Sequence, residues 1–244
     1  MSVLSKLNDC VKTKGAGFII LIDPDKKNDK KIDQMVQTAN LYADAIFVGG
    51  SIMMDKLYHE RVKRIKSISK IPVILFPGGV NQLNDYYDAI LFMSLLSGRN
   101  SHYLIGEQVI AAPIVRDFGI ETIPTGYLLV DGGSPTTVEF VSGTKPLSPS
   151  RPDVIISHAL AAQYLGMRLI YLEAGSGAIN KIPENVIKKI ASEIDIDLIV
   201  GGGIRTPQMA KNIVDSGASH VVIGSAVEDS IEIAKEFSSA IHNN

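Results

Sequence analysis

The chain has 244 residues, with 24 basic and 26 acidic side chains, a formal net charge of −2 and 45% hydrophobic residues. This composition is that of a globular protein and excludes a disordered or fibrous chain. The near-neutral net charge shows no excess of basic residues of the kind that binds nucleic acid or an anionic membrane surface.

Cysteine and histidine usage narrows the kinds of site that the chain can hold. Cys10 is the only cysteine, which excludes an intramolecular disulfide and a metal site built from cysteines. We expect Cys10 to be a small structural residue of the amphipathic opening segment. The histidines show no metal-ligand spacing, so we expect structural or surface roles for them. They are His59, His102, His158, His220 and His242.

The sequence shows no targeting or membrane-spanning pattern. The opening residues, MSVLSKLNDCVK, lack the apolar core of a secretion signal. No uncharged apolar run approaches the roughly 18–20 residues that span a bilayer. These patterns predict a cytoplasmic protein.

Short apolar runs alternate with longer amphipathic segments along the chain. The runs are rich in Ile, Val and Leu without polar alternation, which is typical of parallel strands buried on both faces. The predicted strands are Phe18–Ile22, Ala45–Val48, Pro72–Phe76, Ala89–Met93, Glu121–Leu129, Arg168–Glu173, Leu198–Gly201 and His220–Ile223. The predicted helices are Lys30–Tyr42, Met53–Ser69, Ser101–Phe118, Pro152–Leu165, Pro183–Ile194, Pro207–Ser216 and Asp229–Ile241.

Eight strands in strict alternation predict one (β/α)₈ TIM barrel, formed by residues 1–244 as a single domain. A doubly wound open sheet is the alternative fold. The segment Val130–Arg151 is long and rich in turn residues, so we expect it to be irregular. We also expect it to be mobile and to lie near the active-site face.

Most of the 21 glycines follow predicted strands, at the face where barrels of this type carry their chemistry. Three motifs stand out in the last three strands: YLEAGSG from Tyr171, VGGGIRTP from Val200 and VIGSAVE from Val222. Their backbone N–H groups predict a site for a phosphate monoester. Glycines that serve only the packing of the βα turns are the alternative.

An acidic motif, LIDPDKKN, follows the first predicted strand. Asp23 and Asp25 alternate around Pro24, so at least one carboxylate is expected to point into the barrel mouth. Such a carboxylate suits Mg²⁺, which takes one or two carboxylates together with substrate phosphate oxygens; helix capping is the alternative role. Ser51 ends the VGGS motif after the second strand and is either a further oxygen ligand or a helix cap. A phosphate site and a Mg²⁺-diphosphate site in one barrel imply two phosphorylated substrates.

At this point the sequence resembles the geranylgeranylglyceryl phosphate synthase family. The matching motifs are IDPDK, FVGGS, ILFPG, YLEAGSGA, VGGGIR and IGSA. The resemblance implies transfer of a prenyl group from an allylic prenyl diphosphate to the 3-hydroxyl of sn-glycerol 1-phosphate. It places Mg²⁺ on Asp23 and Ser51. It places glycerol phosphate on Tyr171, Leu172, Glu173, Ala174, Gly175, Ser176, Gly177, Gly202, Gly203, Gly224 and Ser225.

The implied mechanism gives one role to the magnesium side of the site and another to the glycerol phosphate side. Mg²⁺ at Asp23 neutralises the leaving diphosphate. Glu173 is expected to accept the proton of the attacking hydroxyl, and Tyr171 to position the substrate. The prenyl tail needs an apolar groove, with geranylgeranyl as the expected chain and a longer heptaprenyl chain as the alternative. The candidate groove residues, each of which also suits the core, are Leu95, Leu96, Ile105, Tyr127 and Leu129.

Two other functions fit parts of the pattern. A sugar-phosphate isomerase or aldolase barrel would share the phosphate loops, but it needs a second acid or a Schiff-base lysine, for which Lys26 is the only near candidate. A non-catalytic phosphate-binding protein would have no use for both IDPDK and YLEAGSG. The family resemblance further implies a homo-oligomer and peripheral membrane contact through the lipid product, and the near-neutral charge predicts no nucleic-acid partner.

Overall fold

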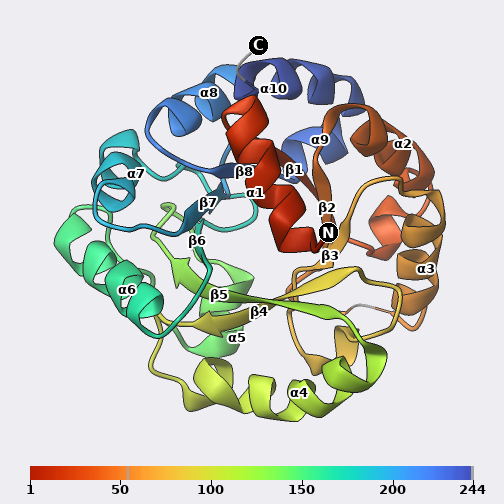
Figure 1. Cartoon of the computed structure of the whole chain (residues 1–244), viewed down its shortest axis with the longest axis horizontal. Helices are drawn as coiled ribbons and strands as arrows, with labels where there is room; N and C mark the ends of the chain where they lie inside the picture. Colours follow the sequence, from red (N-terminus) through yellow and green to blue (C-terminus); the bar gives the residue numbers. More distant parts are fainter. Residues whose placement is uncertain (54, 243–244) are drawn as a thin grey trace.

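The computed structural model describes residues 1–53 and 55–242, with the side chain of Lys26 excepted. Within them, eight parallel strands close into a barrel in chain order, and helices surround it (Figure 1). The strands are β1 (Gly17–Ile22), β2 (Ala45–Val48), β3 (Val73–Leu75), β4 (Ala89–Leu95), β5 (Glu121–Leu129), β6 (Leu169–Glu173), β7 (Asp197–Gly201) and β8 (His220–Ile223). The first strand pairs with the last, Gly17 opposite His220, which confirms the barrel over an open sheet.

Helices alternate with the strands as predicted. They are α2 (Ile32–Tyr42) after β1, α3 (Tyr58–Ile68) after β2, α4 (Glu107–Phe118) after β4, α6 (Pro152–Tyr164) after β5, α7 (Glu184–Ala191) after β6, α8 (Pro207–Asp215) after β7 and α10 (Ala234–Ile241) after β8. Only a 3₁₀ turn, η2 (Val80–Gln82), follows β3. The helix predicted to begin at Met53 begins at Tyr58 in the described residues, and Met54 lies outside them.

Short helical elements add to this frame and were not predicted separately. They are the 3₁₀ turns η1 (Lys26–Asn28) and η4 (Ile231–Ile233), the π-helical turn η3 (His102–Gly106) and the short helices α5 (Thr137–Ser142) and α9 (Ser225–Asp229). The last helix therefore starts at Ala234 rather than at Asp229, because α9 and η4 occupy the intervening residues.

The segment predicted to be irregular between 130 and 151 is irregular over most of its length, and it also holds the short helix α5, which was not predicted. The hydroxyl of Thr136 caps α5 by accepting the backbone N–H of Glu139. Val130 also forms a parallel bridge with Leu147, which pins the segment to the end of β5. A capped helix of six residues is too short for its periodicity to stand out in a turn-rich stretch.

Apolar side chains form two layers on either side of the barrel wall. Alternate strand residues such as Phe47 and Tyr171 fill the barrel interior. Their neighbours, such as Val48 and Leu172, pack outward against the helices. The barrel is therefore a filled core, and the space for a ligand lies at its rim.

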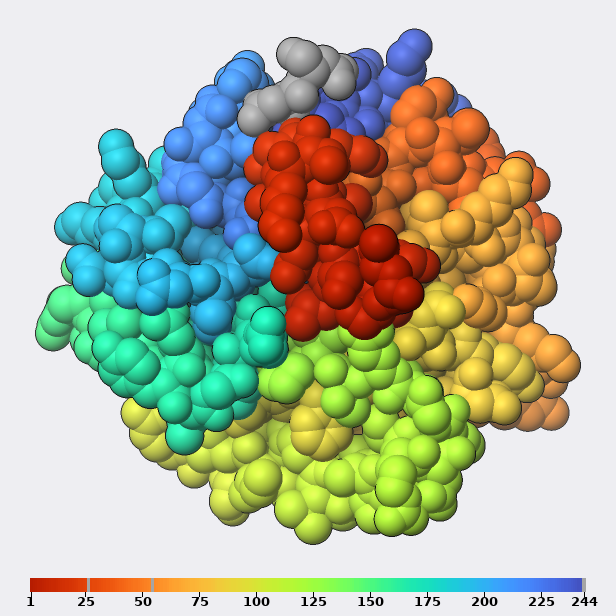
Figure 2. Space-filling view, viewed as in Figure 1, coloured from red at the N-terminus to blue at the C-terminus, as the bar shows by residue number. Residues whose placement is uncertain are grey.

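The helix α1 (Val3–Lys14) closes the N-terminal end of the barrel. Val3 and Leu7 join the interior layer, and Glu121 at the start of β5 accepts the backbone N–H groups of Val3 and Leu4 at 2.5 and 3.0 Å. Figure 2 shows α1 lying across the middle of this face. The opposite face, at the C-terminal ends of the strands, is left for the site.

Candidate active site

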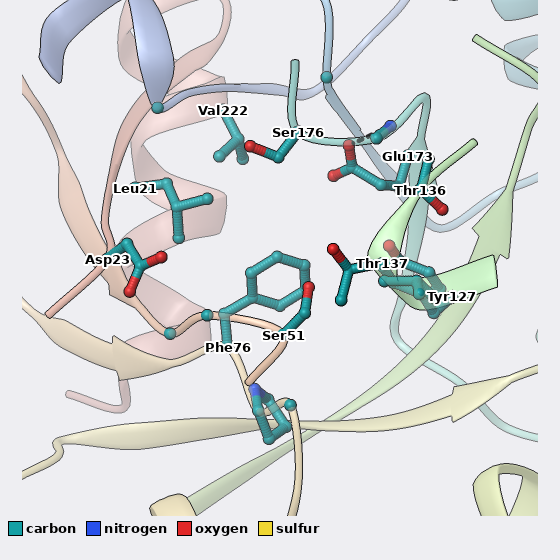
Figure 3. A pocket seen from close by; sticks show the side chains of 18 of the residues that line it. Leu21, Asp23, Ser51, Phe76, Tyr127, Thr136, Thr137, Glu173, Ser176 and Val222 are labelled. Carbon is teal, nitrogen blue, oxygen red and sulfur yellow. Dashed lines mark hydrogen bonds between the residues drawn. The ribbon is translucent and has the colours of Figure 1, made fainter. Parts of the chain in front are cut away.

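A cavity of about 720 Å³ lies at the C-terminal ends of the strands, and each of the eight strands or its following loop contributes to its wall. Asp23 and Glu173 stand on opposite sides of it, with Phe76 between them in this view (Figure 3). The two ends of the predicted site therefore face one cavity.

Glu173 is the last residue of β6 and is only 7% exposed. Burial raises the pKa of its carboxyl group to about 7, although the Gly175 amide and the Tyr171 hydroxyl favour the ionised form. The Gly175 N–H donates to Oε1 at 2.6 Å. A carboxyl group that titrates near neutral pH and faces a cavity is suited to accept a proton.

Two glycines of the β7 end leave room for this carboxylate. A Cβ on Gly201 would lie 2.5 Å from the Tyr171 hydroxyl and 3.1 Å from Glu173 Oε2. A Cβ on Gly202, whose φ is +84°, would lie 2.4 Å from Glu173 Oε1. Gly202 was predicted to bind phosphate; the structure adds that it encloses the carboxylate of Glu173.

Tyr171 lies fully buried beneath Glu173. Its ring stacks on Phe76 at 4.9 Å and on Tyr127 at 5.6 Å, between ring centroids. Its hydroxyl has no hydrogen-bond partner of full geometry. Burial, then the charge of Glu173, raises the pKa of this hydroxyl well above its ordinary value, so Tyr171 stays protonated. It can support or donate to a substrate, and it does not accept a proton.

The residues predicted for glycerol phosphate gather on one wall of the cavity. Ser176 and Gly177 are exposed there, and the backbone of Gly177 takes a φ of +72° with open space around it. Gly203, Gly224 and Ser225 line the neighbouring wall, where α9 begins. This wall presents backbone amides and hydroxyls, which are groups that bind phosphate oxygens.

Two residues of that predicted set do not line the cavity. Leu172 and Ala174 are fully buried in the outer layer, against the helices. Successive residues of a strand point to opposite faces, so neighbours of Tyr171 and Glu173 turn away from the ligand side. We therefore correct their assignment as substrate-binding side chains.

Asp23 and Ser51, where the resemblance placed Mg²⁺, line the cavity from the loops after the neighbouring strands β1 and β2. The carboxylate of Asp23 rests against the backbone of Gly50, since a Cβ there would lie 2.7 Å from Oδ1. Burial raises the pKa of Asp23 to about 6, opposed by Lys27 and reinforced by Glu228 and Asp25.

The donor set on this wall fits a hard cation that takes most of its ligands from substrate. The described residues contain no group of three or more His, Cys, Asp or Glu side chains that could hold a metal ion by themselves. One carboxylate and one hydroxyl oxygen, facing a cavity with room for phosphate oxygens and water, match the way Mg²⁺ binds with phosphorylated substrates.

The apolar part of the cavity lies against β4, α4 and α5. Of the predicted groove residues, Leu95 and Tyr127 line the cavity, whereas Leu96, Ile105 and Leu129 do not. Sequence patterns missed other lining residues, among them Phe92, Met93, Val138 and Val141. Val138 and Val141 belong to α5, whose existence was itself not predicted.

A Schiff-base lysine, which the aldolase alternative requires, is not evident among the described residues of the cavity wall. The side chain of Lys26 lies outside the described residues. The next lysine, Lys27, lines the cavity, and its ammonium group pairs with Glu228 at 3.3 Å. A paired, largely exposed lysine lacks the desolvated setting that activates an amine as a nucleophile.

Comparison with known proteins gives one consistent result. Residues 8–241 match the sequence model of the PcrB family. The chain is 42% identical to the geranylgeranylglyceryl phosphate synthase of Chitinophaga pinensis, over 95% of this chain and 92% of the relative. It is 43% identical to the geranylgeranylglyceryl phosphate synthase of Pyrococcus horikoshii, over 92% of this chain and 89% of the relative.

Solved structures agree with the sequence relatives. The crystal structure of (S)-3-O-geranylgeranylglyceryl phosphate synthase from Thermoplasma acidophilum, in complex with its substrate sn-glycerol-1-phosphate, matches with a TM-score of 0.92. The two chains are 36% identical, and the match covers 99% of this chain and 98% of that one. In the described residues, no helix is both long and apolar enough to cross a membrane.

Proposed function

The chain belongs to the PcrB family, and on that premise we propose that it transfers a prenyl group from an allylic prenyl diphosphate to the 3-hydroxyl of sn-glycerol 1-phosphate. The ether oxygen of the product comes from the glycerol, and diphosphate leaves. One observation carries the proposal: a buried carboxyl group, Glu173, with a pKa of about 7, faces Asp23 across a single cavity. Geranylgeranyl diphosphate is the proposed donor.

Glu173 acts as the general base. The 3-hydroxyl oxygen attacks the first carbon of the prenyl group, the bond from that carbon to the diphosphate oxygen breaks, and the hydroxyl proton passes to Glu173. Tyr171 supports the glycerol from below. Backbone amides and hydroxyls hold the phosphate in place, supplied by Gly175, Ser176, Gly177, Gly202, Gly203, Gly224 and Ser225.

Asp23 and Ser51 would hold Mg²⁺ at the diphosphate side of the cavity. When bound there, Mg²⁺ would neutralise the charge that builds up on the departing diphosphate. The apolar wall against β4, α4 and α5 excludes water from the prenyl chain and so favours transfer to the glycerol over hydrolysis.

Incubation with labelled sn-glycerol 1-phosphate, Mg²⁺ and a ladder of prenyl diphosphates tests the proposal. We expect a labelled ether product, most of it from geranylgeranyl diphosphate, and loss of activity with EDTA that added Mg²⁺ restores. A preference for heptaprenyl diphosphate would change the assignment of the donor and leave the proposed reaction as it is. No product with any donor, or full activity in EDTA, would contradict the proposed reaction or its metal.

We also propose a cytoplasmic homo-oligomer that meets membranes through its lipid product. The opening segment forms α1, and Val3 and Leu7 pack in the barrel end, so this segment is part of the folded barrel. Large apolar side chains exposed on α4 and α5, such as Val109 and Phe140, support contact with a second copy. Light scattering tests the oligomer, and co-sedimentation with vesicles in the presence of product tests the membrane contact.

A further inference from the structure

A buried arginine lies behind the wall that carries Asp23 and Ser51. Arg61, on α3, is 5% exposed and does not line the cavity. Its Nη1 donates to the carbonyl of Pro24 at 3.3 Å and to the two carboxylate oxygens of Asp55 at 2.8 and 3.0 Å. Its Nε donates to Asp29 Oδ1 at 3.0 Å.

These partners belong to the two loops that carry the proposed Mg²⁺ ligands. Pro24 follows Asp23 directly in the loop after β1, and Asp29 lies further along it. Asp55 belongs to the loop after β2, which also holds Ser51. One planar guanidinium therefore joins both loops from the side away from the ligand.

We propose that Arg61 is a positioning residue for the magnesium–diphosphate end of the site, because it fixes the loop of Asp23 relative to the loop of Ser51. This inference rests on the proposed function. Arginine suits the task, since its fork of donors is rigid and a lysine cannot reproduce three directed contacts. A metal–diphosphate unit needs its protein oxygens placed to within a fraction of an ångström.

A second set of contacts holds the Asp23 loop independently of Arg61. Asn28 is 4% exposed, and its Nδ2 donates to the carbonyl of Asp23 at 2.9 Å and to Glu228 Oε1 at 3.0 Å. Loss of Arg61 therefore leaves this loop tied to α9 and removes its link to the loop of Ser51. The expected defect is a changed arrangement of two loops rather than an unfolded barrel.

Arg64 provides a matched control on the same helix. It is 41% exposed and pairs with Asp33 Oδ1 at 2.7 Å and with Asp29 Oδ1 at 3.6 Å. Asp29 belongs to the loop after β1 and Asp33 to the first turn of α2, so Arg64 does not join the loops of Asp23 and Ser51 in the way that Arg61 does. Its removal tests whether any loss of charge on this face of α3 has the same effect.

The experiment compares Arg61→Lys, Arg61→Met and Arg64→Met with the wild-type chain. Calorimetry measures the binding of inorganic diphosphate in the presence of Mg²⁺ and, separately, the binding of sn-glycerol 1-phosphate, both without turnover. We expect both Arg61 variants to weaken magnesium–diphosphate binding by roughly 10–100-fold, as outer positioning residues of metal sites do, and to change glycerol phosphate binding less than about twofold. Arg64→Met should change neither by more than about twofold.

Asp55→Asn guards against a folding failure of the Arg61 variants. The Asp55 side chain also accepts the backbone N–H of Leu57 at 2.8 Å, and asparagine keeps an oxygen for that contact while weakening the pairing with Arg61. We expect it to weaken magnesium–diphosphate binding at least roughly fivefold, with an unfolding temperature close to that of the wild type.

Unchanged magnesium–diphosphate binding in the folded Arg61 variants would overturn the positioning role. If those variants do not fold, unchanged magnesium–diphosphate binding in Asp55→Asn would overturn it. Equal weakening of magnesium–diphosphate binding and of sn-glycerol 1-phosphate binding would overturn it as well. A wild-type chain that binds no magnesium diphosphate would contradict the proposed function itself, and the role of Arg61 with it. The wild-type titration therefore separates the two failures.

Discussion

At the scale of single residues, the chemistry depends on how one carboxyl group is held. Burial at the end of β6 raises the pKa of Glu173 to about 7. One amide hydrogen bond, from Gly175, fixes Oε1 at 2.6 Å. The position of this residue at the end of a buried strand was evident from sequence, whereas its pKa was not, because its burial depends on Gly201 and Gly202, which lie 28 and 29 residues further along the chain.

Glu173→Gln should lower turnover by roughly 10²–10⁴-fold, because the amide keeps the shape of the side chain and cannot accept a proton. Tyr171→Phe is the control: its hydroxyl has no hydrogen-bond partner of full geometry, so its loss should lower turnover less than about tenfold. Steady-state kinetics on the folded variants measures both. Near-normal turnover of Glu173→Gln would assign the proton to another acceptor.

The raised pKa of Glu173 predicts the direction in which the reaction rate changes with pH. Below a pH of about 7 the carboxyl group is protonated and cannot act as a base, so kcat/KM should fall about tenfold per pH unit as the solution becomes more acidic. Above about pH 7 this group no longer limits the rate. The residual activity of Glu173→Gln should lack this limb near pH 7, and a limb with the same midpoint in the variant would assign it to a different group.

At the scale of elements, the glycine loop after β7 shapes the site as much as it binds ligand. The GGG triplet was predicted from sequence as a phosphate loop. Its second role is visible only in three dimensions, since the Cβ of an alanine at Gly202 would meet the carboxylate of Glu173 and the amide of Gly175. Arg61 was missed for a similar reason: YHERVKRI has the pattern of a solvated helix face, and although Asp55 lies six residues before Arg61, the partners Pro24 and Asp29 lie 37 and 32 residues before it.

Gly202→Ala should therefore lower both stability and turnover. The substitution strains a backbone with a φ of +84° and places a Cβ 2.4 Å from Glu173 Oε1. Gly119→Ala is the matched control, because its φ is +67° with nothing within 4 Å of the added Cβ. We expect both variants to lose about 1 kcal/mol of unfolding free energy from the strain, and Gly202→Ala alone to lose turnover by at least roughly tenfold. Equal turnover in the two variants would contradict the steric argument.

At the scale of the whole molecule, the alternation of apolar and amphipathic segments was sufficient to predict the barrel. Each strand was predicted within two residues of its observed ends, because strands buried on both faces have no polar positions to obscure them. The short elements α5 and α9 escaped prediction, since five or six residues carry little periodicity. The closure of the chain by contacts between its ends was also not predictable, because it depends on single polar residues far apart in sequence.

The side chain of Asp44 connects the two ends of the chain, through hydrogen bonds that depend on its being ionised. It accepts Lys14 Nζ from α1 at 2.5 Å, the backbone N–H of Phe18 at 2.8 Å and His242 Nε2, after α10, at 2.8 Å. Burial alone would raise the pKa of Asp44, but the hydrogen bonds from His242, Lys14 and Phe18 outweigh it and hold the pKa at about 2. The folded pKa is thus below the ordinary value, so Asp44 stabilises the fold above about pH 4 and loses that effect as the pH falls towards 2.

Asp44→Asn should reduce the unfolding free energy at neutral pH by about 2 kcal/mol, the value of a pKa shift of this size. Asp88→Asn is the control, since Asp88 pairs with Lys66 and the Val73 N–H in the same way but is more exposed, at 31% against 2% for the side chain. Asp88→Asn should therefore lower the unfolding free energy by less than Asp44→Asn does. Denaturant unfolding at pH 7 and pH 3 measures the unfolding free energy of both variants. Equal losses of unfolding free energy at pH 7 would contradict the stabilising role of Asp44.

The central claim is that one cavity brings the 3-hydroxyl of sn-glycerol 1-phosphate to the first carbon of a prenyl diphosphate. Mass spectrometry of a reaction with sn-glycerol 1-phosphate carrying ¹⁸O in its 3-hydroxyl tests this claim most directly. We predict that the label appears in the prenyl ether and that the released diphosphate carries none. Label in the diphosphate, or a prenyl product without label, would contradict the claim.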